Sequence, residues 1–600
     1  MKLKKKMNIK NIIILIIPLL LLIVFEYPYY CFSKNIIIAI ILIYSIYFML
    51  LSIFKNIKIT TIILGILGYI IQVVSIGKVQ FIGDPLWFSD IFYTGDISEI
   101  LNLIKDDLLH TLVILLPKLL ILLVLTILII ILSSKFNNII FSKLKRLVIF
   151  SISFIVLLLL FLPIKSINKF MINIFYNNDY YLTHVNISSG DDYYKTYGHL
   201  SGIYGNILES RVYKPDDYNL SVIKNVLKNT KDEEDNTLGK PNIIVIFSES
   251  FWDIDKLDEI EFDKEITPNY NKLKNDGLFF NMVSPFYGGM SSNIEFEFLT
   301  GGTTNYFSSS YVPYMELYNS SIYYDAPSII TELKNNDYYT KMVAYYSPKL
   351  YNCGKVYKYM DVDSKEFIEH VDKKNIRGQY VSDKYVVDNI IKELDNKDSK
   401  PLFYMTLTMQ SHMPYLISKY DNYDIDIVKS DLDDKYNDSL KSYAQGIYDA
   451  DKELGRLYEY INTIDEPTII VFYGDHLPYL EAMGYLDYFN TDDEKLNAFR
   501  KYNTESLIVS NYDISSLKDE NINFLGPDLL SSYILNHMDI KVSNYYKWLY
   551  STINIVGTSN RYVSLDQEGN IYYTSKLKGK MKDIYNLRKN IQYKYFHNIK

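Results

Sequence analysis

The sequence predicts an α-helical membrane domain of five spans followed by an α/β domain with a mainly parallel central sheet. Long apolar runs fill the first 165 of the 600 residues. Further along the chain, short β-branched runs alternate with helix-like stretches, and chemically reactive side chains follow several of these runs. Because 600 residues exceed what one hydrophobic core supports, more than one domain is expected.

Apolar runs of nearly the length that crosses a bilayer dominate the N-terminal region. A membrane-spanning helix needs ~20 such residues, and lipid forces the backbone to satisfy its own hydrogen bonds. The lysine-rich start resembles a signal peptide, but no small-residue cleavage site follows it, so we expect a retained anchor. The five predicted spans are about 11–26, 36–54, 60–77, 111–132 and 147–163.

Charges between the runs predict the orientation. Lysines precede the first span, Lys55 and Lys58 separate the second from the third, and Lys143, Lys145 and Arg146 precede the fifth. The segment between the third and fourth spans is acidic. By the positive-inside rule the N-terminus is cytoplasmic, and five crossings place the α/β domain outside the cell.

Composition divides the chain into four parts. We predict a transmembrane domain over 1–165, a polar juxtamembrane linker over 166–238, an extracellular α/β domain over 239–545 and a C-terminal extension over 546–600. The extension is basic, which suits either a solvated helix or contact with anionic lipid or polymer. The net charge of -8 argues against nucleic acid as a partner.

The α/β prediction rests on short β-branched runs of the kind found in buried strands. Strands that alternate with helices favour a mainly parallel sheet. The predicted strands are 242–247, 341–345, 402–408, 468–473 and 506–509, with helix-like stretches at 326–335 and 383–395.

Reactive side chains follow these strands. Glu249 follows the first strand, Asp475 and His476 follow the strand at 468–473, and His412 follows the strand at 402–408. Ser291 lies after two glycines that permit a sharp turn. In parallel sheets ligands bind beyond the carboxyl ends of the strands, so we expect these residues in one site.

The residue types favour phosphoryl chemistry at a divalent cation. Glu249, Asp475 and His476 offer carboxylate and imidazole ligands, and Ser291 offers a hydroxyl that a cation can activate. This donor set admits manganese, magnesium or zinc. Cys31 and Cys353, which are the two cysteines, build neither a disulfide framework nor a cysteine-based zinc site.

Four motifs then carry a resemblance to a known family. The chain resembles the lipoteichoic acid synthase family, a branch of the alkaline phosphatase and sulfatase superfamily, over nearly its whole length. The resemblance implies a sulfatase-like fold for the extracellular domain. The motifs are Ser248-Glu249-Ser250, Gly288-Gly289-Met290-Ser291-Ser292-Asn293-Ile294-Glu295-Phe296, Ser411-His412-Met413-Pro414 and Gly474-Asp475-His476.

The resemblance also implies roles for the site residues. Ser291 stands where the family usually has a threonine nucleophile, and Glu249, Ser291, Asp475 and His476 would bind one cation, commonly manganese. His412 would contact the substrate phosphate or assist the leaving group. The family takes glycerol phosphate from phosphatidylglycerol and adds it to a glycolipid-linked polymer, so lipid, membrane and cell-wall acceptor are the expected partners.

One departure from the family pattern keeps alternatives open. Cys353 stands where the family usually has an arginine that holds the head group, and Lys349 is a nearby cation. A cysteine cannot replace the bidentate phosphate contact of an arginine. The alternatives are transfer of another head group such as phosphoethanolamine, a sulfatase-like phosphodiesterase, and a non-catalytic membrane protein that binds cell-wall polymer.

Overall fold

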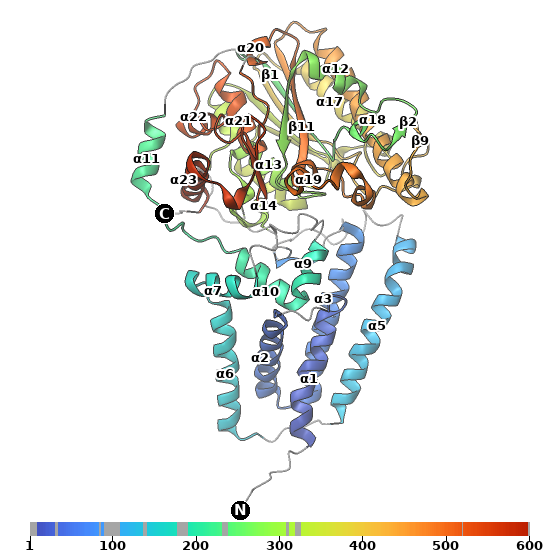
Figure 1. Ribbon diagram of the computed structural model, residues 1–600, viewed down its shortest axis with the longest axis vertical. Coiled ribbons are helices and arrows are strands. Elements are labelled where there is room, and N and C mark those ends of the chain that lie inside the picture. The colour runs from blue at the N-terminus through green and yellow to red at the C-terminus, as the bar shows by residue number, and fades with distance from the viewer. Residues whose placement is uncertain are drawn as a thin grey trace, which may run out of the picture. The chain divides into compact units, whose positions relative to one another are not determined.

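A computed structural model gives the structure of the chain, and its contacts divide the described residues into two units (Figure 1). The first unit ends at Tyr213 and the second begins at Lys214. The described residues are 9–30, 34–82, 86–88, 90, 108–135, 141–176, 190–230, 238–307, 311–318, 326–518 and 520–597. The basic residues before the first span, most of the acidic segment between the third and fourth spans, and Cys31 lie outside them.

Apolar helices make up most of the first unit, which confirms the predicted helical apolar region. Four described helices are long and apolar enough to cross a membrane, and a shorter apolar helix, Ile12–Glu26, covers the first predicted span. The helices are α1 (Ile9–Glu26), α2 (Ile36–Phe54), α3 (Ile57–Ile82), α5 (Leu108–Ser134) and α6 (Lys143–Phe161).

Three more helices of the first unit come from the segment predicted as a linker: α7 (Lys165–Phe175), α9 (Gly190–Tyr197) and α10 (His199–Glu209). The Glu26 carboxylate accepts hydrogen bonds from the backbone N–H groups of His199 at 2.6 Å and Leu200 at 3.1 Å. Because a helix N-terminus has unsatisfied N–H groups, this carboxylate fixes the start of α10 against the end of α1.

A seven-stranded sheet forms the core of the second unit and has the order β3-β11-β10-β1-β8-β4-β5. The five strands from β10 to β5 are mutually parallel, and β11 is antiparallel to both of its neighbours. The predicted, mainly parallel sheet is therefore confirmed. The strands are β1 (Asn242–Ser248), β3 (Leu278–Val283), β4 (Tyr339–Ala344), β5 (Ser364–Phe367), β8 (Leu402–Leu407), β10 (Thr468–Gly474) and β11 (Asn503–Ser510).

Helices cover both faces of this sheet. One layer consists of α12 (Pro268–Asp276), α17 (Asp383–Asn396) and α18 (Asp434–Ile461), and the other contains α13 (Ser291–Thr300) and α21 (Pro527–Asn536) (Figure 1). The central strands β1 and β10 are buried along their whole length, as expected for strands between two helical layers.

The predicted C-terminal extension belongs to the second unit. It begins within α22 (Asn544–Tyr550) and continues through a small antiparallel sheet of β12 (Thr558–Ser559), β13 (Val563–Leu565) and β14 (Ile571–Tyr573) to α23 (Gly579–Phe596). In α23 the buried Arg588 pairs with the buried Asp528 of α21 at 2.7 Å. This pair and the buried Ile591 and Phe596 show that one face of α23 is packed.

Candidate functional site

The carboxyl ends of β1 and β10 create the site because these two strands are parallel neighbours. Ser248 pairs in register with Gly474, so the residues after each strand emerge side by side. Gly474 is required there, since a Cβ atom at this position would lie 2.0 Å from the Phe251 carbonyl oxygen. The Asp475 N–H then donates to the Ser248 carbonyl at 3.2 Å and ties the two strand ends together.

A tight turn after β1 orients Glu249. Ser250 adopts a left-handed conformation with φ of 53°, which is uncommon for a residue with a side chain. Its N–H donates to Asp475 Oδ1 at 2.7 Å, and its hydroxyl donates to Glu249 Oε1 at 2.8 Å. The Glu249 N–H donates to Thr408 Oγ1 at 3.1 Å. The turn therefore directs the Glu249 carboxylate toward Asp475.

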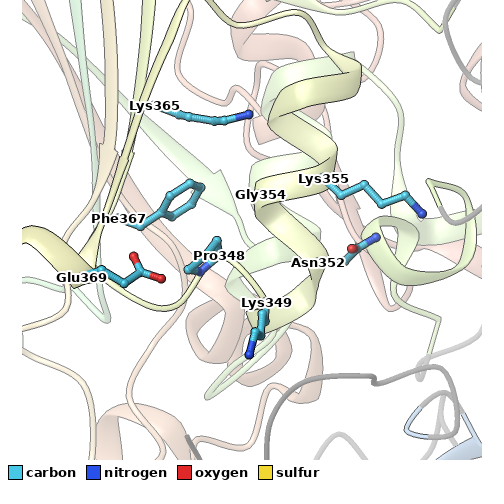
Figure 2. Close-up of a pocket in the computed structure, with 8 residues that line it drawn as sticks. All are labelled: Pro348, Lys349, Asn352, Gly354, Lys355, Lys365, Phe367 and Glu369. Atoms are coloured by element: carbon cyan, nitrogen blue, oxygen red, sulfur yellow. The ribbon is translucent and has the colours of Figure 1, made fainter.

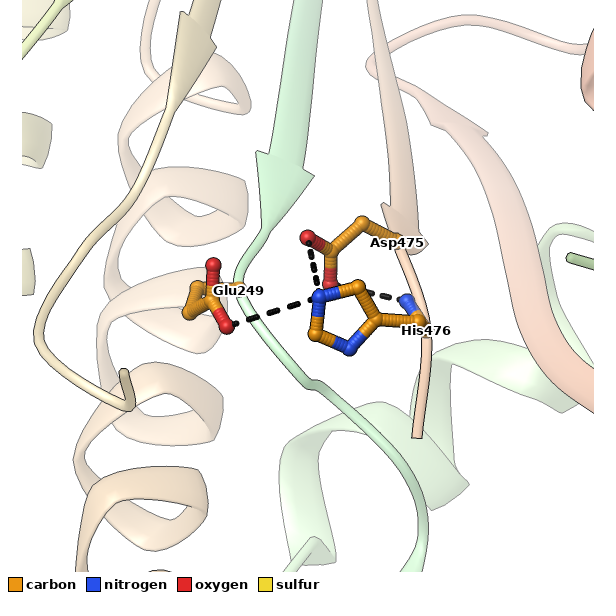
Figure 3. Close-up of side chains that lie close together, drawn as sticks. All are labelled: Glu249, Asp475 and His476. Carbon is orange, nitrogen blue, oxygen red and sulfur yellow. Dashed lines mark hydrogen bonds and ion pairs between the residues drawn. The ribbon is translucent and has the colours of Figure 1, made fainter. Parts of the chain in front are cut away.

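His476 completes a cluster of three possible metal ligands, shown in Figure 3. Its Nδ1 lies 2.9 Å from the Leu477 carbonyl oxygen, which can only accept, so Nδ1 carries a hydrogen and Nε2 is the nitrogen that faces the two carboxylates. Nε2 lies 3.3 Å from Asp475 Oδ2 and 3.8 Å from Glu249 Oε1. The ligand atoms of these three residues all lie within 4.8 Å of one another.

Ser291 is the first residue of α13 and lies beside this cluster. Its hydroxyl donates to Asp475 Oδ2 at 2.7 Å. The turn before it needs unusual backbone conformations, with φ of 69° at Gly288 and 67° at Met290. This turn brings the N-terminus of α13 to the strand ends. The structure thus places Glu249, Ser291, Asp475 and His476 together.

The electrostatics of the cluster suit a bound cation. Glu249 is 2% exposed and Asp475 is fully buried, and neither forms an ion pair with a lysine or arginine among the described residues. Burial, and then the neighbouring Asp475, raise the pKa of the Glu249 carboxyl well above its usual range. Two buried carboxylates, the imidazole nitrogen Nε2 and a hydroxyl form a donor set that fits one divalent cation.

His412 lies on the loop after β8, with no hydrogen bond to the other four site residues among the described contacts. Its Nδ1 lies 2.8 Å from the Met413 carbonyl oxygen and 3.0 Å from the Tyr380 hydroxyl, which itself donates to that carbonyl. Nδ1 therefore carries the hydrogen, and Nε2 is an acceptor. Burial lowers the pKa of His412, which favours the neutral ring.

The buried Lys419 contacts His412, and no sequence pattern predicted this contact. Its ammonium donates to the His412 carbonyl at 2.6 Å and lies over the rings of Tyr380 and Tyr415. Burial lowers the pKa of Lys419 to about 7. The Tyr415 hydroxyl in turn donates to Ser250 Oγ at 3.4 Å. A lysine in a polar loop ordinarily indicates a solvated side chain, so the sequence contained no signal for this role.

Cys353 is fully buried at the start of α16 (Cys353–Tyr359). Its Sγ contacts the carbonyl oxygens of Ser347 at 3.6 Å and Pro348 at 3.5 Å. Among the described residues, no contact joins it to the cluster of possible metal ligands Glu249, Asp475 and His476. The thiol closes the preceding turn, while Lys349 is exposed at the surface.

Part of this chain is similar to known proteins. The sulfatase family model matches residues 241–540. A Rhizobium meliloti protein named as a cyclic beta-1,2-glucan modification protein is 30% identical over 336 residues, which are 55% of this chain and 51% of that protein. The chain therefore spans about half the length of this curated relative.

Two solved structures are similar to part of this chain, and the first of them shares its fold. The phosphoglycerol transferase GacH of Streptococcus pyogenes, in complex with sn-glycerol-1-phosphate, is 24% identical, with a TM-score of 0.51 over 65% of this chain and 99% of that chain. The lipoteichoic acid synthase LtaP of Listeria monocytogenes is 18% identical, with a TM-score of 0.45 over 63% of this chain and 98% of that chain.

Proposed function

The chain belongs to the sulfatase family, and on this premise we propose that it is a membrane-anchored phosphoglycerol transferase. It moves a phosphoglycerol group from phosphatidylglycerol to a cell-envelope acceptor such as lipoteichoic acid, through a phosphoryl–serine intermediate. The observation that carries the proposal is the 2.7 Å hydrogen bond from the Ser291 hydroxyl to Asp475, beside a cluster able to hold a cation. The choice of glycerol phosphate rests on the motif resemblance.

Glu249, Ser291, Asp475 and His476 would hold one divalent cation, and the resemblance favours manganese. When bound, such a cation neutralises charge on a phosphoryl oxygen and lowers the pKa of a neighbouring hydroxyl. The protein contributes the fixed positions of the four donors, because backbone N–H groups hold each strand end and the turn before α13. A scaffold that only binds polymer has no need of this arrangement.

In the first step the Ser291 oxygen attacks the phosphorus of the lipid head group. The bond from Ser291 Oγ to phosphorus forms, the bond from phosphorus to the diacylglycerol oxygen breaks, and the serine proton ends on diacylglycerol. Asp475 Oδ2 accepts the hydrogen of the serine hydroxyl beforehand and fixes the direction of the oxygen lone pairs.

In the second step a hydroxyl of the acceptor attacks the phosphoryl–serine. The bond from the acceptor oxygen to phosphorus forms, the bond to Ser291 breaks, and the acceptor proton returns to the serine. The neutral His412 has its Nδ1 hydrogen held by Met413, so its Nε2 is able to take that proton in transit. The phosphodiester bond is conserved, and no nucleotide is required.

In the proposed orientation the catalytic domain lies outside the cell and the N-terminus lies in the cytoplasm. The basic loops of the sequence support this orientation through the positive-inside rule. Membrane anchoring also raises the effective concentration of a lipid donor at the site.

The direct test uses the full chain in detergent with phosphatidylglycerol and a glycolipid acceptor. The parent is expected to release diacylglycerol and to form glycerol phosphate–acceptor product, and Ser291→Ala is expected to lose both. The matched control is Ser292→Ala, since the Ser292 hydroxyl is buried without a hydrogen-bond partner among the described residues. Diacylglycerol release by Ser291→Ala at the parent rate would overturn the mechanism.

The same assay separates the alternative donors and reactions. Phosphatidylethanolamine replaces phosphatidylglycerol in a parallel reaction, and the acceptor is omitted in another. Turnover restricted to phosphatidylethanolamine would assign the other head group. Turnover that is equally fast without acceptor would assign a phosphodiesterase. Product formation from phosphatidylglycerol that requires the acceptor supports the proposal.

A further inference from the structure

A second feature lies at the same end of the sheet as the cluster of Glu249, Asp475 and His476, where the parallel strands have their carboxyl ends. A cavity of about 480 Å³ opens between β5, α16 and the loop after β4 (Figure 2). Lys349, Lys355 and Lys365 line it together with Phe367 and Glu369. We name it the β5 pocket. None of these residues takes part in the site described above.

The sheet register sets the distance between the two features. Phe247, Leu407, Ala344 and Phe367 form one row of paired residues across β1, β8, β4 and β5. At one end of this row, Glu249 follows Phe247 by two residues along the chain. At the other end, Phe367 lines the β5 pocket. Three steps between neighbouring strands separate them, or about 14 Å. A monomeric head group bound at Ser291 does not reach that far, whereas a polymer does.

The β5 pocket is chemically suited to an anionic chain that carries hydroxyl groups. Its described lining residues include three lysines and one carboxylate. Lys365 forms no ion pair or hydrogen bond with any described residue, whereas Glu366, which follows it, pairs with Lys341 at 3.6 Å. In Figure 2 Lys365 and Phe367 extend from β5 toward α16. The half-buried Phe367 ring offers an apolar face to the C–H groups of a polyol or sugar.

The backbone of the loop after β4 is held in an unfavourable conformation beside this pocket. Tyr351 and Asn352 are consecutive residues with side chains in the left-handed region, with φ of 50° and 63°. Such conformations persist when the surrounding structure imposes them, and they concentrate at ligand sites. Here the Gly354 N–H donates to the Pro348 carbonyl at 2.9 Å, which helps to fix the loop.

This loop is also connected to the helix that carries Ser291. The Asn352 side-chain amide donates to the Tyr314 carbonyl at 3.3 Å, and the Tyr314 hydroxyl donates to Glu295 Oε1 at 2.9 Å. Glu295 lies one helical turn after Ser291 in α13. Two hydrogen bonds therefore link the wall of the pocket to the nucleophile helix.

We propose that the β5 pocket is an acceptor subsite that binds a phosphate-bearing segment of the envelope polymer, a few units behind the hydroxyl that reacts at Ser291. The inference rests on the proposed function and adds to it the place on the domain where the acceptor chain binds. Lysine side chains bind its phosphates, and the distance of about 14 Å makes binding depend on chain length.

The first experiment measures binding without turnover. Full-length Ser291→Ala protein in detergent is titrated with fluorescent glycerol phosphate oligomers of increasing length, with glycerol phosphate itself and with a neutral glycan. We expect long oligomers to bind more tightly than the monomer and the neutral glycan, and salt to weaken them. In this background Lys365→Glu is expected to weaken the long oligomer roughly tenfold.

The matched control is Lys358→Glu, because Lys358 is an exposed lysine of the same helix α16 outside the pocket. We expect it to change oligomer affinity less than about twofold, as for a peripheral charge. Equal affinity of Lys365→Glu and the parent for the long oligomer would overturn the subsite. Equal binding of the neutral glycan would overturn its anionic class.

The second experiment uses the active chain. Lys365→Glu is expected to raise the KM for a polymeric acceptor by a larger factor than it lowers the rate of phosphatidylglycerol consumption at saturating acceptor. Slower donor consumption with normal oligomer binding would assign the pocket to the lipid head group instead. If phosphatidylglycerol is not a donor at all, the proposed function fails, while the binding experiment still reports on the pocket.

Discussion

The cluster of possible metal ligands and the β5 pocket lie at the same end of one sheet and differ in burial, in charge and in the contacts that hold their residues. Glu249, Asp475 and His476 are at most 3% exposed and follow the central strands β1 and β10. The pocket is basic, and its Lys365 is exposed on the edge strand β5. Backbone hydrogen bonds hold each residue of the cluster, whereas long lysine side chains line the pocket.

This difference indicates that the cluster is rigid and that, in the proposed function, the pocket would select the acceptor. A cation needs donors at fixed positions, and central strands covered on both faces supply them. Recognition of a charged polymer needs side chains of opposite charge that are long enough to contact it, and it tolerates side-chain motion. We therefore expect substitutions at the cluster to abolish turnover, and substitutions toward β5 to change acceptor preference or stability.

The largest effect is expected for Asp475→Asn. Asp475 Oδ1 accepts the N–H groups of Ser250 and His476, and Oδ2 accepts the Ser291 hydroxyl. The amide keeps the volume but loses the charge and one acceptor, so transfer activity is expected to fall by roughly a hundredfold or more. Manganese at a hundred times its Kd is expected to stabilise the parent by about 3 kcal/mol and this variant much less.

Asp465→Asn serves as the control, because Asp465 is an exposed carboxylate just before β10. Its activity and its response to manganese are expected to match those of the parent. Thermal unfolding without added metal reports whether Asp475→Asn is folded. Full activity of a folded Asp475→Asn protein would show that the cluster is not the reaction centre.

A smaller effect is expected for Glu295→Gln, which tests the burial of the residue that links the two regions. Burial raises the pKa of Glu295 from 4.5 to about 7. Between these values the folded chain binds a proton that the unfolded chain has lost, so the free energy of unfolding falls as the pH rises. The fall amounts to about 3 kcal/mol and is complete above about pH 7.

Glutamine is neutral at every pH, so Glu295→Gln is expected to lack this fall. Denaturant unfolding of both proteins at several pH values from 4 to 8 measures the difference. Glu459→Gln is the control, since Glu459 is exposed on α18 and its replacement should leave the pH profile unchanged. Parallel profiles for Glu295→Gln and the parent would show that Glu295 is not buried in the folded chain.

Much of the fold follows from the sequence because its central strands are chemically distinct. Ile243, Ile244 and Val245 in β1 and the β-branched start of β10 form buried runs that few other structures accommodate. The strand β5 has the sequence Ser-Lys-Glu-Phe, and a polar edge strand of this kind lacks that signal. The helices α9 and α10 were missed because their apolar residues are interspersed in a polar segment.

The site residues also divide into those that sequence patterns predict and those that they do not. Glu249, Asp475 and His476 were predictable because each directly follows a buried strand, and Ser291 because it follows a glycine turn. Lys419 and Tyr380 approach His412 only through tertiary packing, which leaves no local pattern. Lys365 was missed with its strand. Residues fixed by strand ends are therefore readable from sequence, and residues brought in by loops are not.

The smallest effect on turnover is expected at Cys353, where the sequence suggested a change in head-group binding. The structure buries its thiol against two carbonyl oxygens, and burial raises the pKa of the Cys353 thiol well above its usual range. In a Cys31→Ser background, maleimide is therefore expected to label Cys353 only after denaturation, whereas an added Lys358→Cys change labels in the folded state. Cys353→Ser is expected to change transfer less than about twofold, because serine can donate to the same carbonyls and the helix α13 is unchanged. Rapid labelling of folded protein that also stops transfer would place this thiol in the substrate path, and the distinction between a catalytic cluster and a separate selecting surface would then fail.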